Sequence, residues 1–483
     1  MENLHLTEQD HRDARTFALL DVAAKRTQQR FDIAPKNVGW RRMRKDRCQH
    51  PGMFAPHGDI VSLLDTKWIV LLLCALLAAC GRADPGAITL KFWTFGREGE
   101  VVSQLLPEFE RAHPGVHVVV QTMPLTAAHE KLLTAFAGDA LPDLCQLGNT
   151  WIPEFAALHA LEPLQPYVDK SRVVRPEDYF AGIWDTNVVD GKLYGASWYV
   201  DTRLLFYRKD LLAQAGFDRP PRNWDEWRRA LAAIKAGQGK DKYAVFLPLN
   251  EFEPLLNLAI QQSDPLLRED GTRGNFESPG FRRAFAFYVE MFRQDWAPLL
   301  SNTQLPNIWD EFARGYLAFY ISGPWNIGEF KRREPQLDGR WSTAPLPGVG
   351  GPGGGAAGGS SFAIFHSSKN KQLAWELAEF LSAVPQQQRF YALTGDLPAR
   401  RSAWDYPELA NDEYARAFRE QLELVKATPK VPEWERIANE MQLMADRVIR
   451  GGMPVDQALH DFDATVDGIL AKRRSLLVRN ERP

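Results

Sequence analysis

The sequence predicts an α/β protein with more than one domain. Strand-like and helix-like runs alternate between residues 88 and 147 in the order β-α-β-α-β, which favours a mostly parallel sheet flanked by helices. A chain of 483 residues is longer than one ordinary hydrophobic core organises. Hydrophobic residues make up 45% and charged residues 25%, a globular composition, and the net charge of −3 shows no basic excess of the kind that nucleic-acid-binding proteins carry.

An apolar run near the N-terminus predicts export. Residues 68–79 read WIVLLLCALLAA and follow Lys67 directly. They are too few for a membrane span of about 20 residues, but they suit the core of a signal peptide. The run ends in Leu-Ala-Ala-Cys and resembles the lipobox of bacterial lipoproteins, which implies cleavage before Cys80 and a lipid on its thiol. A buried apolar helix with an incidental cysteine is the alternative.

The position of the predicted signal peptide determines how the residues before it are interpreted. Residues 1–66 are predicted to be either a mis-assigned start or a disordered extension, because a signal peptide sits at the start of a chain. Cleavage before Cys80 leaves 404 residues (483 − 79), in which Cys145 is the one unmodified cysteine, so no disulfide within the chain is expected. We expect a periplasmic or cell-surface protein held at a membrane by its lipid anchor alone.

The predicted elements of the first domain place two candidate ligand loops. Strands are predicted at 88–95, 116–121 and 143–147, with helices at 101–112 and 126–136, and Pro107 marks a kink or a later start of the first helix. Ligands of parallel sheets bind beyond the carboxyl ends of the strands. The loops at 94–99 and 148–154 are therefore the ones expected to meet a ligand.

The rest of the chain continues as a mixture of strands and helices. Asn223 and Glu226 form a predicted capping box, which starts a helix that ends near residue 236. Trp198, Trp224, Trp227, Trp341 and Trp375 are assigned to the core. Further strands are predicted within 193–207 and at 244–247, 316–322 and 362–365, a loop at 347–359, and helices at 209–215, 281–292, 372–381, 413–426, 434–449 and 455–472.

Eight short strings follow one another in an order typical of one protein family. They are FWTF at 92–95, FERAHPGV at 109–116, GDALPD at 138–143, LYG at 193–195, LFYRKDLL at 205–212, WDEW at 224–227, GPW at 323–325 and GGSS at 358–361. With them the chain resembles the extracellular solute-binding family 1 of ABC transporters, the maltose-binding-protein-like group. The resemblance covers nearly all of residues 87–450.

The resemblance implies a fold and a division of the chain. It implies a type II-like periplasmic-binding-protein fold, in which two α/β lobes joined by crossing strands close on a ligand in the cleft between them. By this analogy the first lobe is expected at 87–198 plus 312–360 and the second at 200–311 plus 362–483.

The implied function is capture without chemistry. The protein is expected to bind a carbohydrate outside the cytoplasm as a monomer and to deliver it to separate ABC permease subunits in the membrane. No P-loop, G-x-S-x-G or H-E-x-x-H is present, so no cofactor, metal or catalytic residue is expected. Two alternatives stay open: a binder of another solute, such as a glycerophosphodiester, a polyamine or a peptide, and a secreted glycoside hydrolase with two carboxyl groups flanking a sugar bond.

Candidate ligand-binding residues combine aromatic faces with polar groups, as carbohydrate sites require. Trp93 and Arg97 lie at the end of the first predicted strand, and Asn149 and Trp151 follow the third. Trp325 matches the Gly-Pro-Trp platform of the family. Packing in the core is the alternative role for these side chains.

A second group of candidates rests on looser arguments. Tyr199 and Asp201 lie in the predicted crossover, where Asp201 and Arg203 could equally pair with each other. Glu251 follows a second-lobe strand and could also belong to a solvated acidic loop. The remaining candidates are Trp309 before a helix, Ser360 after a glycine run, and Arg400 and Trp434, which resemble late site positions of the family.

Overall fold

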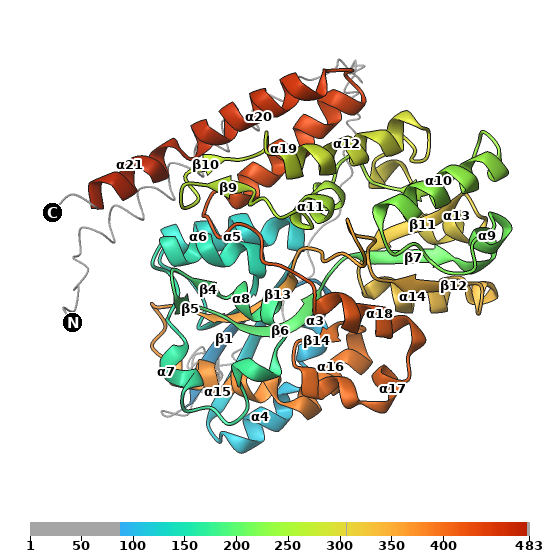
Figure 1. Ribbon diagram of the computed structural model, residues 1–483. Coiled ribbons are helices and arrows are strands. Elements are labelled where there is room, and N and C mark those ends of the chain that lie inside the picture. The colour runs from blue at the N-terminus through green and yellow to red at the C-terminus, as the bar shows by residue number, and fades with distance from the viewer. Residues whose placement is uncertain (1–86, 306, 481–483) are drawn as a thin grey trace, which may run out of the picture.

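Two sheets covered by helices organise residues 87–305 and 307–480, the part of the chain that the computed structural model describes (Figure 1). The predicted signal peptide, the lipobox at Cys80 and the extension at 1–66 lie outside the described residues. None of the described helices is both long enough and apolar enough to cross a membrane.

The first sheet confirms the predicted β-α-β-α-β opening. Its six strands run in the order β14-β6-β13-β3-β1-β2, with β1 parallel to both β2 and β3, and β13 antiparallel to β3 and β6. The strands are β1 (Ile88–Phe95), β2 (Val116–Met123), β3 (Leu144–Gly148), β6 (Ala196–Asp201), β13 (Gly358–Ile364) and β14 (Leu397–Pro398).

The helices of this lobe follow from local sequence signals. The expected helix at 101–112 is split into α3 (Gly96–Val102) and α4 (Leu106–Ala112), because Pro107 lacks a backbone N–H and fits the first turn of a helix rather than its middle. The other helices around the first sheet are α5 (Leu125–Ala137), α6 (Ile152–Ala157), α7 (Gln165–Val168), α8 (Ala181–Asp185), α15 (Lys371–Ser382), α16 (Val384–Thr394) and α17 (Pro407–Ala410).

The second sheet has four strands in the order β12-β7-β11-β8. Strand β11 is parallel to β8 and antiparallel to β7. The strands are β7 (Leu204–Arg208), β8 (Tyr243–Phe246), β11 (Leu317–Ser322) and β12 (Trp341–Ala344). Two short hairpins, β4 (Val188–Val189) with β5 (Lys192–Leu193) and β9 (Leu267–Arg268) with β10 (Arg273–Gly274), stand apart from both sheets.

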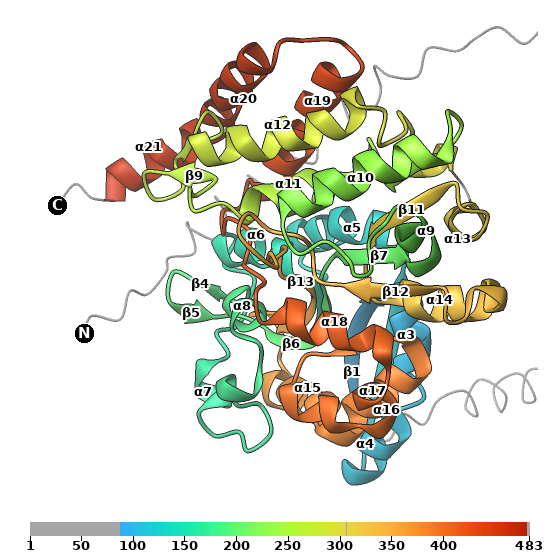
Figure 2. The ribbon, with the colours of Figure 1, turned by 45° about the vertical axis from the view of Figure 1, so that its right-hand side comes forward.

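Helices cover the second sheet, and the C-terminal ones pack beside α12 (Figures 1 and 2). The predicted capping box is confirmed at its N-cap, since the Asn223 side chain accepts a hydrogen bond of 2.8 Å from the Glu226 N–H. The helices are α9 (Lys209–Gln214), α10 (Trp224–Gln238), α11 (Glu253–Ile260), α12 (Pro279–Arg293), α13 (Ile308–Ala313), α14 (Trp325–Arg333), α18 (Glu413–Leu422), α19 (Trp434–Ile449), α20 (Val455–Ile469) and α21 (Ala471–Asn480).

Strand pairing differs from the division expected from sequence. The expected division placed 312–360 in the first lobe, whereas β11 and β12 of that segment pair within the second sheet. It placed 362–483 in the second lobe, whereas α15 packs on β13 and β6, and β14 pairs with β6, all in the first sheet. Pairing partners are set by contacts remote in sequence, so a local pattern predicts that a strand exists but not which sheet it joins.

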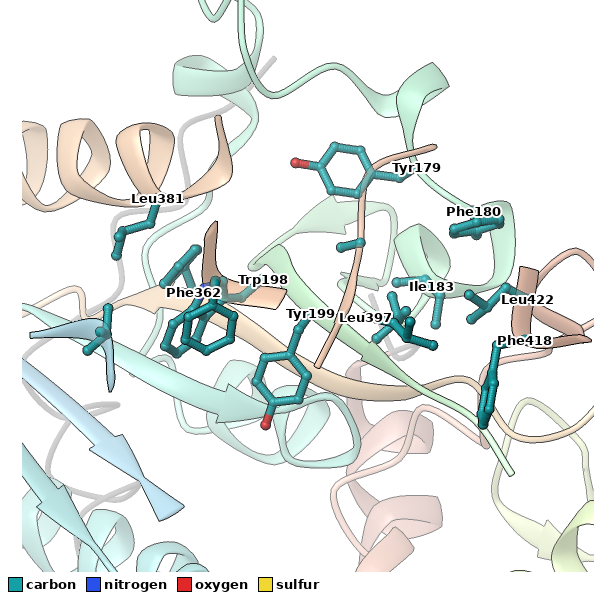
Figure 3. Close-up of a cluster of buried hydrophobic side chains, with 14 of the residues drawn as sticks. Tyr179, Phe180, Ile183, Trp198, Tyr199, Phe362, Leu381, Leu397, Phe418 and Leu422 are labelled. Atoms are coloured by element: carbon teal, nitrogen blue, oxygen red, sulfur yellow. The ribbon is translucent and has the colours of Figure 1, made fainter. Parts of the chain in front are cut away.

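Two large aromatic-rich clusters form the core, and the first of them extends from the first sheet to Phe206 and Trp341 of the second. In the first lobe Trp198 stacks on Phe362 at 4.8 Å between ring centroids and lies 4.6 Å from Phe390 (Figure 3). The five tryptophans assigned to structure are all buried, which confirms that part of the prediction. A second cluster around Trp227 and Tyr288 joins the second sheet to α10, α12 and α19. Burying such rings supplies much of the apolar area that stabilises each lobe.

The two lobes are joined by crossing segments that lie side by side. Thr202 and Arg203 connect β6 of the first sheet to β7 of the second, and residues 345–357 connect β12 back to β13. A third segment, 423–433, pairs with the second crossing: the Lys426 N–H donates to the Gly355 carbonyl at 3.0 Å, and the Ala357 N–H donates to the Lys426 carbonyl at 2.8 Å. The facing edges of the two sheets meet beside this junction.

Candidate ligand-binding site

The carboxyl edge of the first sheet gathers residues from four strands. Strands β1 and β3 run in the same direction as β6, because β13 lies antiparallel between β3 and β6. Their C-terminal ends therefore open at one edge, together with the N-terminal end of β13. Gly148, Ser360 and Tyr199 lie side by side across β3, β13 and β6. The sequence placed candidate residues at this edge, and the topology brings them together.

A buried hydrogen-bond network fixes this edge. Gln146 accepts from the Phe95 N–H at 3.0 Å and donates to the Tyr199 hydroxyl at 3.0 Å and the Ser360 hydroxyl at 3.3 Å. Ser360 also donates to Tyr199 at 3.0 Å, and Tyr199 donates to the Glu98 carboxylate at 3.1 Å. Ser360 is only 2% exposed. Tyr199 and Ser360 are therefore engaged with protein groups, and Tyr199 connects the network to Glu98.

The aromatic candidates of the first lobe, Trp93 and Trp151, are half-buried. Trp151 contacts Phe95 at 5.6 Å and His129 at 5.0 Å between ring centroids. The Lys131 ammonium lies over the ring of Trp93, 5.1 Å from its centroid. Asn149 is buried: its Oδ1 accepts from Ser361 at 3.2 Å, and its Nδ2 has no hydrogen-bond partner among the described residues.

The facing edge of the second sheet presents charged and aromatic residues. Strands β8 and β11 are parallel, so Glu251, after β8, and Trp325, after β11, come to the same edge. Leu204 pairs with Ser322, which places Arg203 next to Gly323 at the point where the chain enters from the first lobe. Trp325 is 40% exposed, an unusual position for an indole. Trp309 lies behind it and donates to Asn326 at 2.7 Å.

Ionic contacts connect the two edges. The Arg203 guanidinium donates to both oxygens of Asp201 at 2.9 and 3.0 Å and lies 3.7 Å from Glu253. Glu251 accepts from the Asn302 amide at 2.7 Å. The Thr150 side chain of the first lobe acts on the carboxyl of Glu435 in α19, whose pKa it lowers against the opposing effect of burial.

We call this junction the interlobe site. Its residues are Glu98, Thr150, Trp151, Asp201, Arg203, Glu251, Glu253, Trp325, Asp396 and Glu435.

Crowded carboxyl groups give the interlobe site its electrostatic character. Burial, together with the nearby Glu98, raises the pKa of Asp396 to about 7. Burial is also the main reason that the pKa values of Glu98, Glu251 and Glu435 are raised, and Glu253 adds to the effect at Glu251. Such carboxyls are strong acceptors when ionised and can donate when protonated, so they suit ligands rich in hydroxyl groups.

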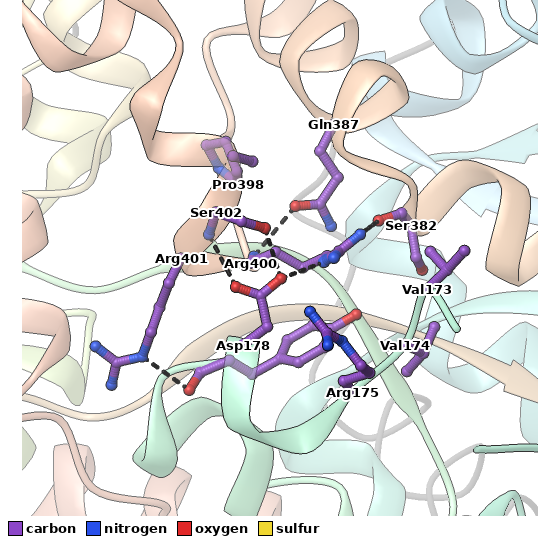
Figure 4. Close-up of polar contacts among 12 residues, drawn as sticks. Val173, Val174, Arg175, Asp178, Ser382, Gln387, Pro398, Arg400, Arg401 and Ser402 are labelled. Carbon is purple, nitrogen blue, oxygen red and sulfur yellow. Dashed lines mark hydrogen bonds and ion pairs between the residues drawn. The ribbon is translucent and has the colours of Figure 1, made fainter. Parts of the chain in front are cut away.

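Like Trp93, Asn149, Tyr199, Trp309 and Ser360, three further predicted candidates are not among the residues of the interlobe site. Arg97 is exposed and donates to the Leu393 carbonyl at 3.1 Å. Arg400 is buried and paired with Asp178 at 2.7 Å, with further donors directed at backbone groups (Figure 4). Trp434 is 1% exposed in the core of the second lobe. The structure gives Arg400 and Trp434 packing roles.

Other features of the described residues offer no rival centre. No group of three or more His, Cys, Asp or Glu side chains within the described ranges is arranged to hold a metal ion. Cys145 is buried, and burial raises the pKa of its thiol, which opposes a nucleophilic role. A hollow of about 470 Å³ on the second lobe is lined by exposed ionic residues, among them Arg219, Arg222, Glu413 and Arg416. We call it the outer hollow.

Comparison with known proteins places this architecture in a family. Residues 95–388 match the family described as bacterial extracellular solute-binding protein, which is more than half of the chain. The chain belongs to the bacterial extracellular solute-binding proteins. The predicted resemblance and the predicted two-lobed α/β fold are thereby confirmed. The family consists of binding proteins that work outside the cytoplasm.

Individual relatives of this solute-binding protein agree with that assignment. The sugar-binding protein MalE of the phytopathogen Xanthomonas citri shares 58% identity, with a TM-score of 0.79, over 81% of this chain and 99% of that one. The diacetylchitobiose-binding protein DasA of Streptomyces coelicolor is 25% identical over 74% of this chain and 83% of its own length. A galactooligosaccharide-binding protein of Bacillus subtilis is 25% identical over 85% of this chain and 98% of its own.

Some residues of the interlobe site and of the buried network that borders it were not predicted from the sequence of this solute-binding protein. Gln146 lies in a strand that reads as purely structural, Asp396 in a turn before the short β14, and Glu435 at the start of a helix. Only their position relative to Glu98, Tyr199 and Thr150 reveals them. For Arg203 the sequence leaves open whether it is a site residue of the crossover or only pairs with Asp201, and the structure places it at the crossing between the sheets, paired with Asp201.

Proposed function

We propose that this solute-binding protein captures a carbohydrate at the interlobe site and delivers it to the permease of an ABC importer. The observation that carries the proposal is the half-exposed indole of Trp325, placed beside carboxylates at the facing edges of the two sheets. The 58% identity to a sugar-binding protein over 99% of that protein supports it.

The chemistry of the interlobe site suits a sugar. A pyranose ring has an apolar C–H face, which an indole covers, and a rim of hydroxyls, which ionised carboxylates and a guanidinium bind. Glu98 and Asp201 approach from the first lobe, while Glu251 and Trp325 approach from the second. A ligand held by both edges stabilises the closed arrangement of the lobes, which a permease can then recognise.

One further solute class is favoured by a specific observation. The carboxyls of the interlobe site outnumber its one guanidinium, and carboxylates beside aromatic rings also bind polyamines. A phosphodiester is less favoured, because Arg203 and Arg400 are already paired with aspartates. A polyamine binder is therefore the second candidate.

We propose further that the protein binds without turnover, as a monomer anchored by a lipid at Cys80. The N-terminal string ending in Cys80 supports the anchor, and family membership supports a role outside the cytoplasm. Mass spectrometry of the membrane fraction tests the anchor: an acylated N-terminal Cys80 is expected, and Cys80→Ser is expected to release the protein from membranes. A soluble, unmodified wild-type chain would overturn it.

A thermal-shift screen tests the ligand class. The purified chain is heated with neutral mono- and oligosaccharides, polyamines, glycerophosphodiesters and amino acids. A ligand at 100 times its dissociation constant adds about 2.7 kcal/mol of stability. Stabilisation by a carbohydrate, recovered intact after long incubation, is the expected result. Thermal stabilisation by polyamines alone would show that the ligand is a polyamine and not a carbohydrate. Release of smaller sugars would show hydrolysis.

A further inference from the structure

Arg203 occupies a position that the strand pairing dictates. It is the last residue of the crossing between β6 and β7, and Leu204, its neighbour, pairs with Ser322 at the end of β11. Because the two strands are antiparallel, the residue before β7 lies beside the residues after β11. Arg203 thus meets Gly323 and Trp325 from a segment that itself joins the two lobes.

The guanidinium is held in place from several sides. Its carbon lies 4.6 Å from the centroid of the Trp325 ring, within range of a cation–π contact. Both oxygens of Asp201, at the end of the first sheet, bind it, and Glu253 of the second lobe lies 3.7 Å away. Burial lowers the pKa of Arg203, but Asp201, Glu253 and Glu251 raise it by more, so the charge is retained.

Trp325 is fixed by these contacts and remains open to a ligand. A Cβ at position 323 would lie 2.0 Å from Cζ3 of Trp325, so the absence of a side chain at Gly323 lets the indole rest against the backbone. The ring is 40% exposed although Arg203 lies over it. An aromatic ring that is held in a fixed orientation before the ligand arrives loses less conformational entropy on binding.

We propose that Arg203 is a positioning residue, which fixes the Trp325 platform and links its orientation to the crossing between the lobes. The inference rests on the proposed function of the interlobe site. When the lobes move about the crossing at 202–203, the contact with Asp201 moves Arg203, and Arg203 moves with the ring on which it stacks. The platform is thereby set in its binding orientation as the lobes close.

The planar guanidinium is essential to this role. It can stack flat on an indole while its planar fork binds two carboxylate oxygens, whereas a lysine ammonium is a compact point charge without a flat face or a fork of donors. A role in neutralising Asp201 and Glu253 would need only the charge. Arg203→Lys therefore separates positioning from charge neutralisation.

The matched control is Arg228. It also lies over an aromatic ring, 4.8 Å from Phe287, and contacts the Glu290 carboxylate at 3.0 Å, but it belongs to α10 in the second lobe. Arg228→Met thus removes an arginine with the same kinds of contact away from the interlobe site.

The first measurement needs no ligand. The full chain is labelled with 5-fluorotryptophan, and the ¹⁹F resonance of Trp325 is assigned by its loss in Trp325→Phe. Arg203→Met and Arg203→Lys are expected to shift or broaden this resonance, while Arg228→Met leaves it unchanged. An unchanged Trp325 resonance in folded Arg203→Met overturns the inference whatever the ligand proves to be.

The second measurement is affinity for the best carbohydrate of the thermal-shift screen. Arg203→Met and Arg203→Lys are each expected to weaken binding at least about tenfold, with Arg228→Met close to wild type. Wild-type affinity in Arg203→Lys would overturn positioning by stacking. A wild-type chain that binds no carbohydrate contradicts the proposed function instead, and the ¹⁹F result then decides the inference by itself.

Discussion

Two arginine–aspartate pairs in this solute-binding protein have similar N–O distances but different surroundings. Arg400 lies 2.7 Å from Asp178, and Arg203 lies 2.9 Å from Asp201. Around Arg400 the remaining groups are satisfied by the protein itself: Arg400 donates to the Ser382 carbonyl, and Asp178 accepts from Ser402 (Figure 4). Around Arg203 lie a half-exposed indole and carboxyls from both lobes.

The difference teaches how to tell a packing arginine from a functional one. The Arg400 cluster closes on itself within the first lobe and joins the segment that follows β14 to the turn before α8. The Arg203 cluster sits on the crossing between lobes and leaves polar and aromatic surface open. The ion pair alone says little about function, since structural and functional pairs look alike. The groups that surround an ion pair distinguish a functional pair from a structural one.

The largest expected effect concerns Arg400. Arg400→Met leaves Asp178 buried without its cation, which destabilises a folded protein by about 3–5 kcal/mol. Urea unfolding followed by far-UV circular dichroism measures it, and carbohydrate affinity at temperatures where the variant is folded should match wild type. Arg175→Met is the control, because the exposed Arg175 lies 3.9 Å from the exposed Glu177, and its loss should change stability by less than about 1 kcal/mol. Reduced affinity in well-folded Arg400→Met would place Arg400 in the site after all.

Trp325→Ala is expected to lower the affinity for carbohydrate without lowering stability, the reverse of Arg400→Met. Removing the platform should weaken carbohydrate binding by about 30-fold or more, since truncating a binding hot spot loses about 2 kcal/mol, while stability stays near wild type. Titration with intrinsic fluorescence or calorimetry measures the affinity. Leu443→Ala on α19 is the control, because Leu443 is exposed to a similar degree. An equal loss of carbohydrate affinity in both variants would argue against a specific role of Trp325 as a platform.

Tyr199→Phe tests the buried network beneath Glu98. Without the hydroxyl, Gln146 and Ser360 lose a shared partner, and the unfolding free energy should fall by about 1–3 kcal/mol. Affinity should fall only modestly, because Glu98 loses its support rather than its charge. Tyr167→Phe, a half-buried tyrosine of α7, is expected to change little. A Tyr199→Phe protein as stable as wild type would show that the network is not stabilising.

The smallest expected effect is a dependence on pH. Burial raises the pKa of Asp396 in the folded protein to about 7, from 3.8 as its ordinary value, so the folded state binds more protons than the unfolded state between these pH values. Stability contributed by this group is therefore complete below about pH 4 and is lost as the pH rises to about 7.

Asp396→Asn removes this titration. Between pH 4 and 7 the Tm of the variant should decline less than that of wild type. At pH 8 its free energy of unfolding should be about 1–2 kcal/mol higher than that of wild type, once solvent screening is allowed for. Thermal unfolding across this pH range is the measurement. If the curves of Tm against pH ran parallel for wild type and variant, the raised pKa of Asp396 would be contradicted.

Much of the fold could be predicted from local sequence patterns. The alternation in residues 88–147 indicated the first sheet, the capping box gave the start of α10, and ordered short strings indicated the family. Trp325, Asp201 and Glu251 could be placed because they follow strands, and strand ends of one direction share an edge.

What the sequence could not predict depends on contacts between distant residues. The assignment of β11, β12 and β13 to sheets depends on pairing, which leaves no local signal. Whether Ser360 and Tyr199 face a ligand or a buried glutamine depends on Gln146, which is more than 50 residues from either. Arg400 resembles a site residue in sequence and becomes structural only because Asp178 lies beside it.

Hydrogen exchange with and without the best carbohydrate tests the central claim most directly. Slower exchange is predicted at both facing edges, in the segments 95–99 and 148–151 of the first lobe and 250–253 and 323–326 of the second. Protection confined to one lobe, or centred on the outer hollow around Arg222 and Arg416, would contradict carbohydrate capture at the interlobe site.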